Sequence, residues 1–144
     1  MIILEIQVNF LAVIAAGIAS MALGFLWYSP MVLGKPWMKE RGLTPEKVKS
    51  DQKEMGKLYG VSFVVSLVMA YVLSHVMALS QNFYNYPMMQ TGLTSAVFMW
   101  LGFMMPVQVT ATIFSDKKNW KLFGIDTGYQ LVSVLAMGAV IGLL

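Results

Sequence analysis

Three polar side chains that could take part in chemistry share one face of an apolar segment near the C-terminus. They are Asp126, Gln130 and Ser133, separated by four and then three residues, the spacing that brings side chains together on a helix. A carboxylate within such a segment is costly in lipid, so it usually marks an ion or proton path or pairs with a nearby group. Gln108 lies at a similar depth in the preceding apolar segment. We expect it to join the same polar patch.

This patch has a functional and a structural interpretation. In the first, Asp126 titrates and serves a proton- or ion-linked site. In the second, it belongs to a hydrogen-bond cluster that locks the last helix to the third, and it pairs with Lys118 or Lys121. Asp126 lies near the end of its segment and close to these lysines, where a charge costs less. This position favours the structural interpretation.

No other pattern predicts a catalytic residue, a cofactor site or a metal site. The single histidine, His75, stands near the end of its apolar segment with Tyr71 four residues before it, and no further metal ligands are evident nearby. Cysteine is absent from the sequence, so disulfides and cysteine-based metal sites are excluded. We therefore predict that the protein is not an enzyme and holds neither cofactor nor metal.

Four long apolar segments must position these side chains. A bilayer core about 30 Å thick takes roughly 20 helical residues to cross, and lipid offers no partners for bare backbone groups. The sequence is 58% hydrophobic and 12% charged, against roughly 25% charged in soluble domains. We predict an all-α membrane protein with four transmembrane helices in a compact bundle, as one domain over residues 1–144. The expected spans are residues 8–33, 58–79, 91–114 and 122–144.

The basic residues predict the orientation of this bundle. Lysine and arginine fall only within residues 35–57 and 117–121, and with four spans these two loops face the same side. The positive-inside rule makes that side cytoplasmic and places both termini outside, in the periplasm of a bacterium. We expect a multi-pass protein of the inner (plasma) membrane. The net charge of +3 comes from these loops, so it does not predict a nucleic-acid partner.

Small residues at four-residue spacing predict close helix packing, because helices in lipid associate through such smooth faces. These faces could meet inside one bundle or between copies. The expected partners are therefore the lipid bilayer and a second copy of the chain or another membrane protein. In the third span, Pro106 removes a backbone donor and predicts a kink. The packing residues are Ala12, Ala16, Ser20 and Gly24 in the first span, Ser62, Ser66, Ala70 and Ser74 in the second, and Gly124, Gly128, Gly138 and Gly142 in the fourth.

Two connections carry signals of their own. Thr44-Pro45-Glu46 is typical of a helix start. An incomplete apolar stripe follows it at Val48, Gln52, Met55 and Tyr59. This pattern predicts either a short amphipathic helix on the inner membrane surface or a solvated linker helix. The uncharged connection over residues 80–90 is rich in aromatic and amide side chains. An interfacial belt is favoured there over a binding surface, and the same belt is expected for Trp27, Tyr28, Trp37 and Trp120.

Three strings in the sequence resemble a known family. They are LGFLWYSP at residues 23–30 followed by Gly34 and Trp37, MAYVL at residues 69–73, and WKLFGIDTGYQLVS at residues 120–133. Together they resemble the small, mostly bacterial membrane proteins grouped as domain of unknown function 1761, over essentially the whole chain. The resemblance implies four spanning helices and no established activity. It also implies Asn or Asp at the position of Asp126, and thus a hydrogen-bonding role.

The sequence as a whole favours a non-catalytic membrane subunit that associates with itself or forms a complex. The alternative is a small oligomeric channel or transporter whose path is lined by the strip Asp126–Gln130–Ser133. Such a path would need several copies, because four helices of one protomer pack solid. A membrane enzyme ranks last, because the clustered acids, histidines or metal ligands that such chemistry needs are missing.

Overall fold

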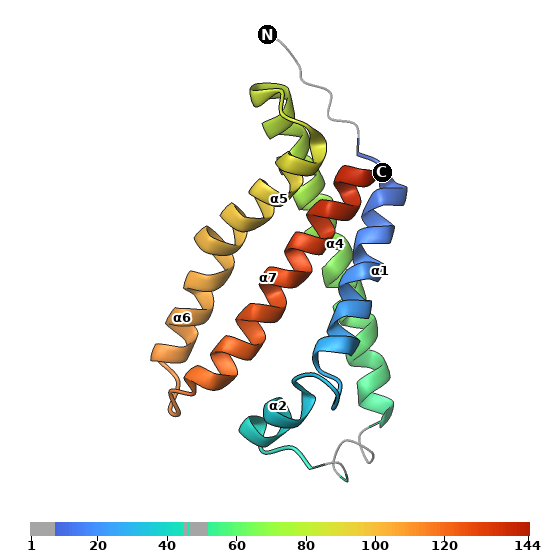
Figure 1. Ribbon diagram of the computed structural model, residues 1–144. Coiled ribbons are helices and arrows are strands. Elements are labelled where there is room, and N and C mark those ends of the chain that lie inside the picture. The colour runs from blue at the N-terminus through green and yellow to red at the C-terminus, as the bar shows by residue number, and fades with distance from the viewer. Residues whose placement is uncertain (1–7, 45, 47–51) are drawn as a thin grey trace.

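The computed structural model describes residues 8–44, 46 and 52–144, and these residues form helices joined by short connections, without a strand (Figure 1). Four helical stretches are long and apolar enough to cross a membrane. They agree with the four expected spans and confirm the all-helical prediction, although their ends differ. The stretches are Phe10–Trp27, Glu54–Tyr84, Met88–Ile113 and Trp120–Leu143.

Helix α1 (Phe10–Trp27) ends six residues before the expected end at residue 33. Pro30 accounts for this early end, because a proline disfavours helical backbone in the residue before it. The chain turns back at that point, where the Ser29 hydroxyl donates to the Leu26 carbonyl at 2.7 Å. A short helix follows, α2 (Gly34–Arg41), and it ends at Gly42 with a left-handed φ of 69°.

The expected surface helix that would begin at Thr44 cannot be followed, because residues 45 and 47–51 lie outside the described residues. The end of its predicted stripe, from Gln52 to Tyr59, belongs to helix α4 (Gln52–Tyr84). Helix α2, which was not expected, occupies the preceding part of this connection. Beyond α4 the chain needs only three residues, 85–87, before the next helix begins.

The third span is one helical run with a widened turn in the middle. It consists of α5 (Met88–Met99), the π-helical turn η1 (Trp100–Met104) and α6 (Met105–Ile113). The expected irregularity at Pro106 therefore takes the form of a π turn just before the proline. Such a turn accommodates the missing donor and the bulk of the ring. Figure 1 shows α6 continuing away from α1 and α4, and neither η1 nor α6 has a buried residue.

Helix α7 (Trp120–Leu143) occupies the centre and contacts every other helix that the structure describes. The residues buried around it are mostly small: Ala12, Ala16 and Ser20 of α1, Ser66, Ala70 and Ser74 of α4, and Ala96 of α5. Gly92 of α5 meets Gly138 of α7 so closely that a Cβ on either residue would strike the backbone of the other. Gly142 lies in the same way against the backbone of Met88 and Met89, whereas Ser62 is exposed. Most of the small residues predicted to pack are therefore buried or in close contact inside this single chain.

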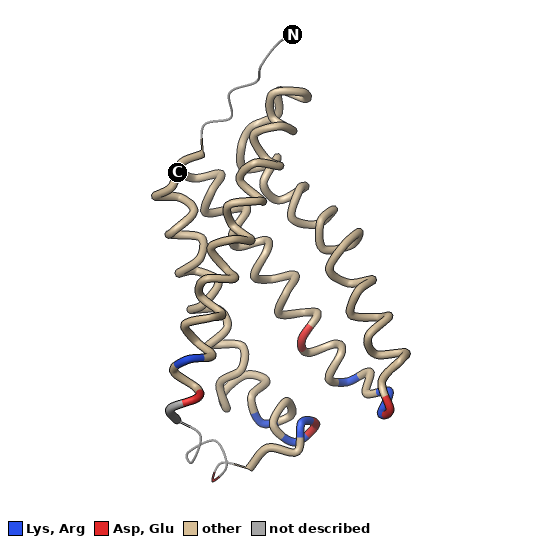
Figure 2. Tube along the Cα trace, turned by 180° about the vertical axis from the view of Figure 1, so that it is seen from behind, with Lys and Arg blue, Asp and Glu red and all other residues tan. Residues whose placement is uncertain are grey.

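The two ends of the molecule differ in charge. Both described ends of the chain meet at one end, where the Asn9 amide donates to the Leu144 carbonyl at 3.4 Å. Figure 2 shows that the charged residues of the described part gather at the opposite end. We call these the uncharged end and the charged end. Asp126 lies on α7, six residues after the helix begins at Trp120.

Candidate functional site at the charged end

The turn after α1 docks two aromatic side chains onto the first turns of α7. The Trp27 indole N–H donates to the Ile125 carbonyl at 3.0 Å. The Tyr28 hydroxyl donates to Oδ1 of Asp126 at 2.7 Å. Gly128 leaves room for the Trp27 ring, since a Cβ there would lie 3.2 Å from the nearest ring atom. The end of α1 is therefore held to α7 by two acceptors in consecutive residues, the backbone carbonyl of Ile125 and the side-chain carboxylate of Asp126.

Gly34 makes this turn possible. Its N–H donates to the Ser29 carbonyl at 2.8 Å, and a Cβ at Gly34 would overlap the backbone of Tyr28 and Ser29. The tight turn places α2 so that Trp37 packs edge-on against Tyr28, with 5.1 Å between ring centroids. The guanidinium carbon of Arg41 lies 5.3 Å from the centroid of the Trp37 ring, within the range of a cation–π contact.

Asp126 accepts from two residues that are distant in the sequence. Besides Tyr28 it pairs with Arg41, whose Nη2 lies 3.4 Å from Oδ2. The Asp126 side chain is 21% exposed and that of Arg41 is 49% exposed, so solvent weakens this ion pair. The shorter hydrogen bond to the carboxylate is the stronger contact. Burial, and next the hydrogen bond to Asp126, hold the pKa of Tyr28 far above its usual range, so Tyr28 stays a neutral donor.

A second contact between α2 and α7 involves Glu40. Asn119 caps the start of α7 by accepting from the Leu122 N–H at 3.0 Å, and its amide donates to Glu40 at 2.8 Å. Lys121 lies 3.8 Å from the same carboxylate. The expected pairing of Asp126 with Lys118 or Lys121 is therefore not what the structure contains. Helix α2, which was not foreseen, brings Arg41 to Asp126 and Glu40 to Lys121.

The strip along α7 faces α1. The hydroxyls of Ser133 and Ser20 lie 2.6 Å apart in a buried hydrogen bond, and the Tyr129 hydroxyl donates to the Ser20 carbonyl at 3.1 Å. The side-chain oxygen of Gln130 is buried and has no partner among the described residues. The polar strip thus joins the last helix to the first, whereas the sequence suggested the third.

Gln108 is not part of this arrangement. It lies on α6, and among the described residues no hydrogen bond connects its side chain with Asp126 or Gln130. The polar contact between α7 and the third span is made instead by Trp100, whose indole N–H donates to the Thr127 carbonyl at 3.0 Å. Gln108 therefore shares no hydrogen bond with the strip on α7 with which it was predicted to form one patch.

Sequence reasoning missed the partners of Asp126 because Trp27, Tyr28 and Trp37 were expected at a lipid interface. All three turn toward α7 or α2, and the indole nitrogen of Trp37 is buried. The spacing of Pro30 and Gly34 was the available signal, since it permits a tight turn. Trp120, by contrast, is exposed, as an interfacial residue would be.

His75 lies away from this site. Its ring packs against Tyr71 with 4.6 Å between centroids, and its Nδ1 is 3.4 Å from the Tyr71 carbonyl. Among the described residues there is no group of three or more acidic or histidine side chains that could hold a metal ion. The site at the charged end is therefore a cluster of aromatic, carboxylate and guanidinium groups that can hold α1, α2 and α7 together.

Comparison with known proteins gives a family and no closer relative. No curated protein and no solved structure matches the chain. The profile of the family described as protein of unknown function (DUF1761) matches residues 11–142. This range contains the turn after α1, all of α2 and the strip on α7. The chain therefore belongs to the DUF1761 family.

Proposed function

We propose that this protein is a non-catalytic membrane subunit that acts through assembly with further copies of itself or with another membrane protein. The observation that carries the proposal is that the second half of the third span, η1 and α6, buries no residue inside one chain. An apolar window of 18 residues in each span allows their burial to be compared. Only 6% of the window is buried in the third span, Met88–Ile113, whereas 28%, 28% and 39% are buried in the first, second and fourth spans. A helix that packs so little inside its own chain has most of its surface available to a partner.

The chemistry of the third span supports this use. At Gly102 no atom lies near the place where a Cβ would stand, so another helix can approach the backbone there. Gln108, on the same span, has no side-chain hydrogen bond among the described residues. An amide at this depth gains from a partner on a neighbouring helix, because lipid offers it none.

The alternative role as a channel or transporter draws less support from the geometry. Ser133 is bonded to Ser20 inside the chain, and Asp126 is bonded to Tyr28 and Arg41. Side chains engaged in this way suit a structural strip better than the wall of an ion path. The proposal therefore assigns the strip to holding α1 and α7 together.

The proposal places the four spans in the inner (plasma) membrane, with the charged end in the cytoplasm and both termini outside. The segregation of charge seen in Figure 2 supports this orientation, because lysine and arginine favour the cytoplasmic side. The compact bundle and the multi-pass topology of the proposal rest on the four apolar helices.

Cysteine cross-linking tests the assembly directly, because the natural sequence contains no cysteine. We would introduce Val107→Cys on α6 and, as a matched control, Leu26→Cys on α1, since these side chains are 64% and 58% exposed. Both lie near the charged end of their spans. After mild oxidation of native membranes, we expect a disulfide-linked dimer for Val107→Cys and little for Leu26→Cys.

Native mass spectrometry of the unmodified chain from nanodiscs complements this test. A defined oligomer supports assembly with copies, and a second protein that co-purifies in fixed ratio supports a hetero-complex. Equal cross-linking of both variants indicates random collision. That result, together with a bare monomer and no co-purified protein, would overturn the proposal.

A further inference from the structure

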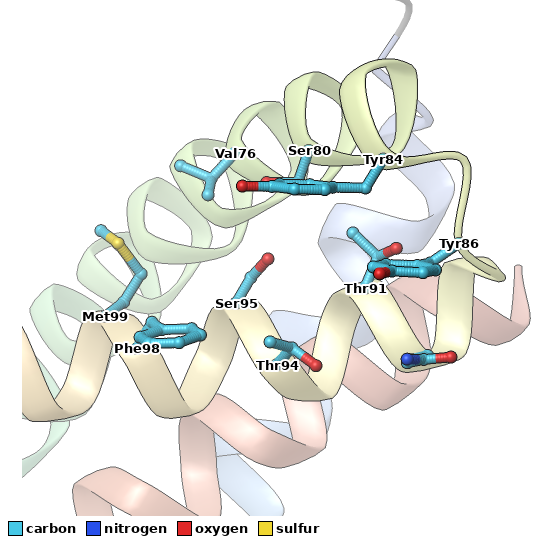
Figure 3. A pocket seen from close by; sticks show the side chains of 10 residues that line it. Val76, Ser80, Tyr84, Tyr86, Thr91, Thr94, Ser95, Phe98 and Met99 are labelled. Atoms are coloured by element: carbon cyan, nitrogen blue, oxygen red, sulfur yellow. The ribbon is translucent and has the colours of Figure 1, made fainter.

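A cavity of about 360 Å³ opens at the uncharged end between α4 and α5 (Figure 3). This volume is within the range of small-molecule sites. Its wall combines aromatic, hydroxyl and apolar side chains, and none of the ten residues that line it is charged. The lining includes Val76, Ser80 and Tyr84 from α4, Tyr86 from the connection, and Thr94 and Ser95 from α5.

The hydroxyl groups in this cavity are available to a ligand. The hydroxyl of a serine or threonine in a helix commonly donates to the backbone carbonyl four residues earlier. The Thr110 hydroxyl, for example, donates to the Pro106 carbonyl at 3.0 Å. Ser80, Thr94 and Ser95 make no hydrogen bond to another described residue. Ser95 is only 7% exposed, so its hydroxyl lies at the bottom of the cavity. Three hydroxyl groups, each able to donate and to accept a hydrogen bond, are therefore available to a ligand in this cavity.

The ring of Tyr84 forms a flat cover opposite the hydroxyls of Thr94 and Ser95. In Figure 3 the ring of Tyr84 extends from α4 across the cavity, with Thr94 and Ser95 on the facing helix. The ring of Tyr86 is parallel to it, with an interplanar angle of 2° and 5.8 Å between centroids. A group that enters between this cover and α5 meets aromatic surface on one side and hydroxyls on the other.

A second, wholly apolar groove of about 250 Å³ continues from this cavity toward the middle of the molecule. It lies between α4, η1 and α7, and its lining includes Val72, Leu73, Phe103 and Met137. Met99 lines both spaces. The uncharged polar cavity at the end of the spans and the apolar groove therefore adjoin at the flexible side chain of Met99.

We propose that these two spaces together bind one neutral lipid. Its headgroup, which carries hydroxyl or carbonyl oxygens, occupies the cavity beneath Tyr84, and one hydrocarbon chain lies along the groove past Met99. The absence of charge from the lining argues for an uncharged headgroup, since a phosphate would leave water for a site without a cation. Glycerol esters and ring-headed isoprenoids share this chemistry. The inference is independent of the assembly proposed above.

The binding test uses the full chain in phosphatidylcholine nanodiscs and native mass spectrometry. The neutral probes are a short-chain diacylglycerol and a decyl-substituted benzoquinone, and the charged comparison is phosphatidylglycerol. We expect saturable binding of at least one neutral probe, at least tenfold tighter than that of phosphatidylglycerol. Binding of the diacylglycerol alone would identify a glycerol headgroup, and binding of the quinone alone would identify a flat ring.

Variants locate the binding at the proposed place. Ser95→Ala removes the deepest hydroxyl with little change of shape, and we expect binding about three- to tenfold weaker, since each hydrogen bond contributes roughly 0.5–1.5 kcal/mol. Val72→Trp fills the groove, and we expect at least a tenfold loss. Val64→Trp is the matched control, because Val64 is an exposed valine two turns earlier on α4 that does not line the groove.

Thermal unfolding of each variant without probe shows that it is folded before binding is compared. The proposal is overturned if no neutral probe binds saturably, or if phosphatidylglycerol binds equally well. It is also overturned if Ser95→Ala and Val72→Trp both bind like Val64→Trp.

Discussion

Tyr28 connects three segments at the charged end. Its hydroxyl bonds to Asp126, and its ring packs edge-on against Trp37 and Tyr129 at 5.1 and 5.3 Å between centroids. Since a phenylalanine keeps the ring and removes only the hydroxyl, this substitution separates the hydrogen bond from the packing.

We expect Tyr28→Phe to lower the free energy of unfolding by about 1.5–3 kcal/mol, the usual range for a hydrogen bond to a charged group. The measurement is unfolding in mixed micelles with increasing denaturing detergent, followed by tryptophan fluorescence. Tyr59→Phe is the control, because Tyr59 is exposed and its hydroxyl bonds to no described residue. Equal stabilities of the two variants would contradict the role given to Tyr28.

Asp126→Asn should be milder than removal of the acceptor. An asparagine oxygen can still accept from Tyr28, whereas the ion pair with Arg41, 49% exposed on the arginine side, contributes little. We expect a loss within about 1 kcal/mol for Asn, and a larger one for Asp126→Leu, which leaves the half-buried Tyr28 hydroxyl without its partner. Similar losses in the same unfolding assay for Asn and Leu would show that the charge matters more than the acceptor.

The sequence was sufficient to single out Asp126 and Ser133 as polar residues on one helix face, but it did not identify their partners. Tyr28 lies 98 positions from Asp126, and Ser20 lies 113 positions from Ser133. Contacts over such separations depend on the turn after α1 and on how α1 lies against α7. Neither follows from helical spacing, and the same aromatic residues satisfy the composition of an interfacial belt equally well.

At the scale of elements, α7 is held to its neighbours by close backbone approach as well as by side chains. Gly138 meets the backbone of Gly92 on α5, whereas Gly124, on the same helix, has open space where a Cβ would stand. Gly138 is therefore a glycine that the neighbouring helix requires, whereas Gly124 is not.

We expect Gly138→Ala to destabilise the chain by about 1–3 kcal/mol, because the added methyl group meets backbone that cannot rotate away. Gly124→Ala should be neutral or should stabilise by about 0.5–1 kcal/mol, since alanine is the better helix former. The same unfolding assay applied to both variants makes the comparison. Loss of stability in Gly124→Ala with none in Gly138→Ala would refute the α5–α7 contact.

The spans themselves could be predicted from hydropathy, and their ends could not. The first span ends at Trp27 because Pro30 forces a turn, and the second runs on to Tyr84 because amide and aromatic residues extend α4 beyond its apolar part. The π turn at Trp100–Met104 was anticipated only as a kink, since a proline marks where backbone bonding changes and not which turn replaces it.

At the scale of the whole molecule, two different surfaces remain after the four spans have packed. The third span offers η1 and α6, which bury no residue within the chain, near the charged end. The hydroxyl-lined cavity and its groove open at the uncharged end. A partner helix and a neutral lipid could therefore be accommodated together, the first along α6 and the second between α4 and α5.

The orientation of these surfaces can be measured on the same cysteine-free chain. Lys118 stands at the charged end and Asn82 near the opposite end of α4, and both are exposed. A membrane-impermeant maleimide added to intact spheroplasts should label Asn82→Cys and reach Lys118→Cys only after the membrane is opened, because the basic loops favour the cytoplasm. The reverse pattern would place the neutral-lipid cavity on the cytoplasmic side and overturn the orientation. Labelling of both variants in intact cells would show that neither end is protected by the bilayer, against a membrane-spanning arrangement.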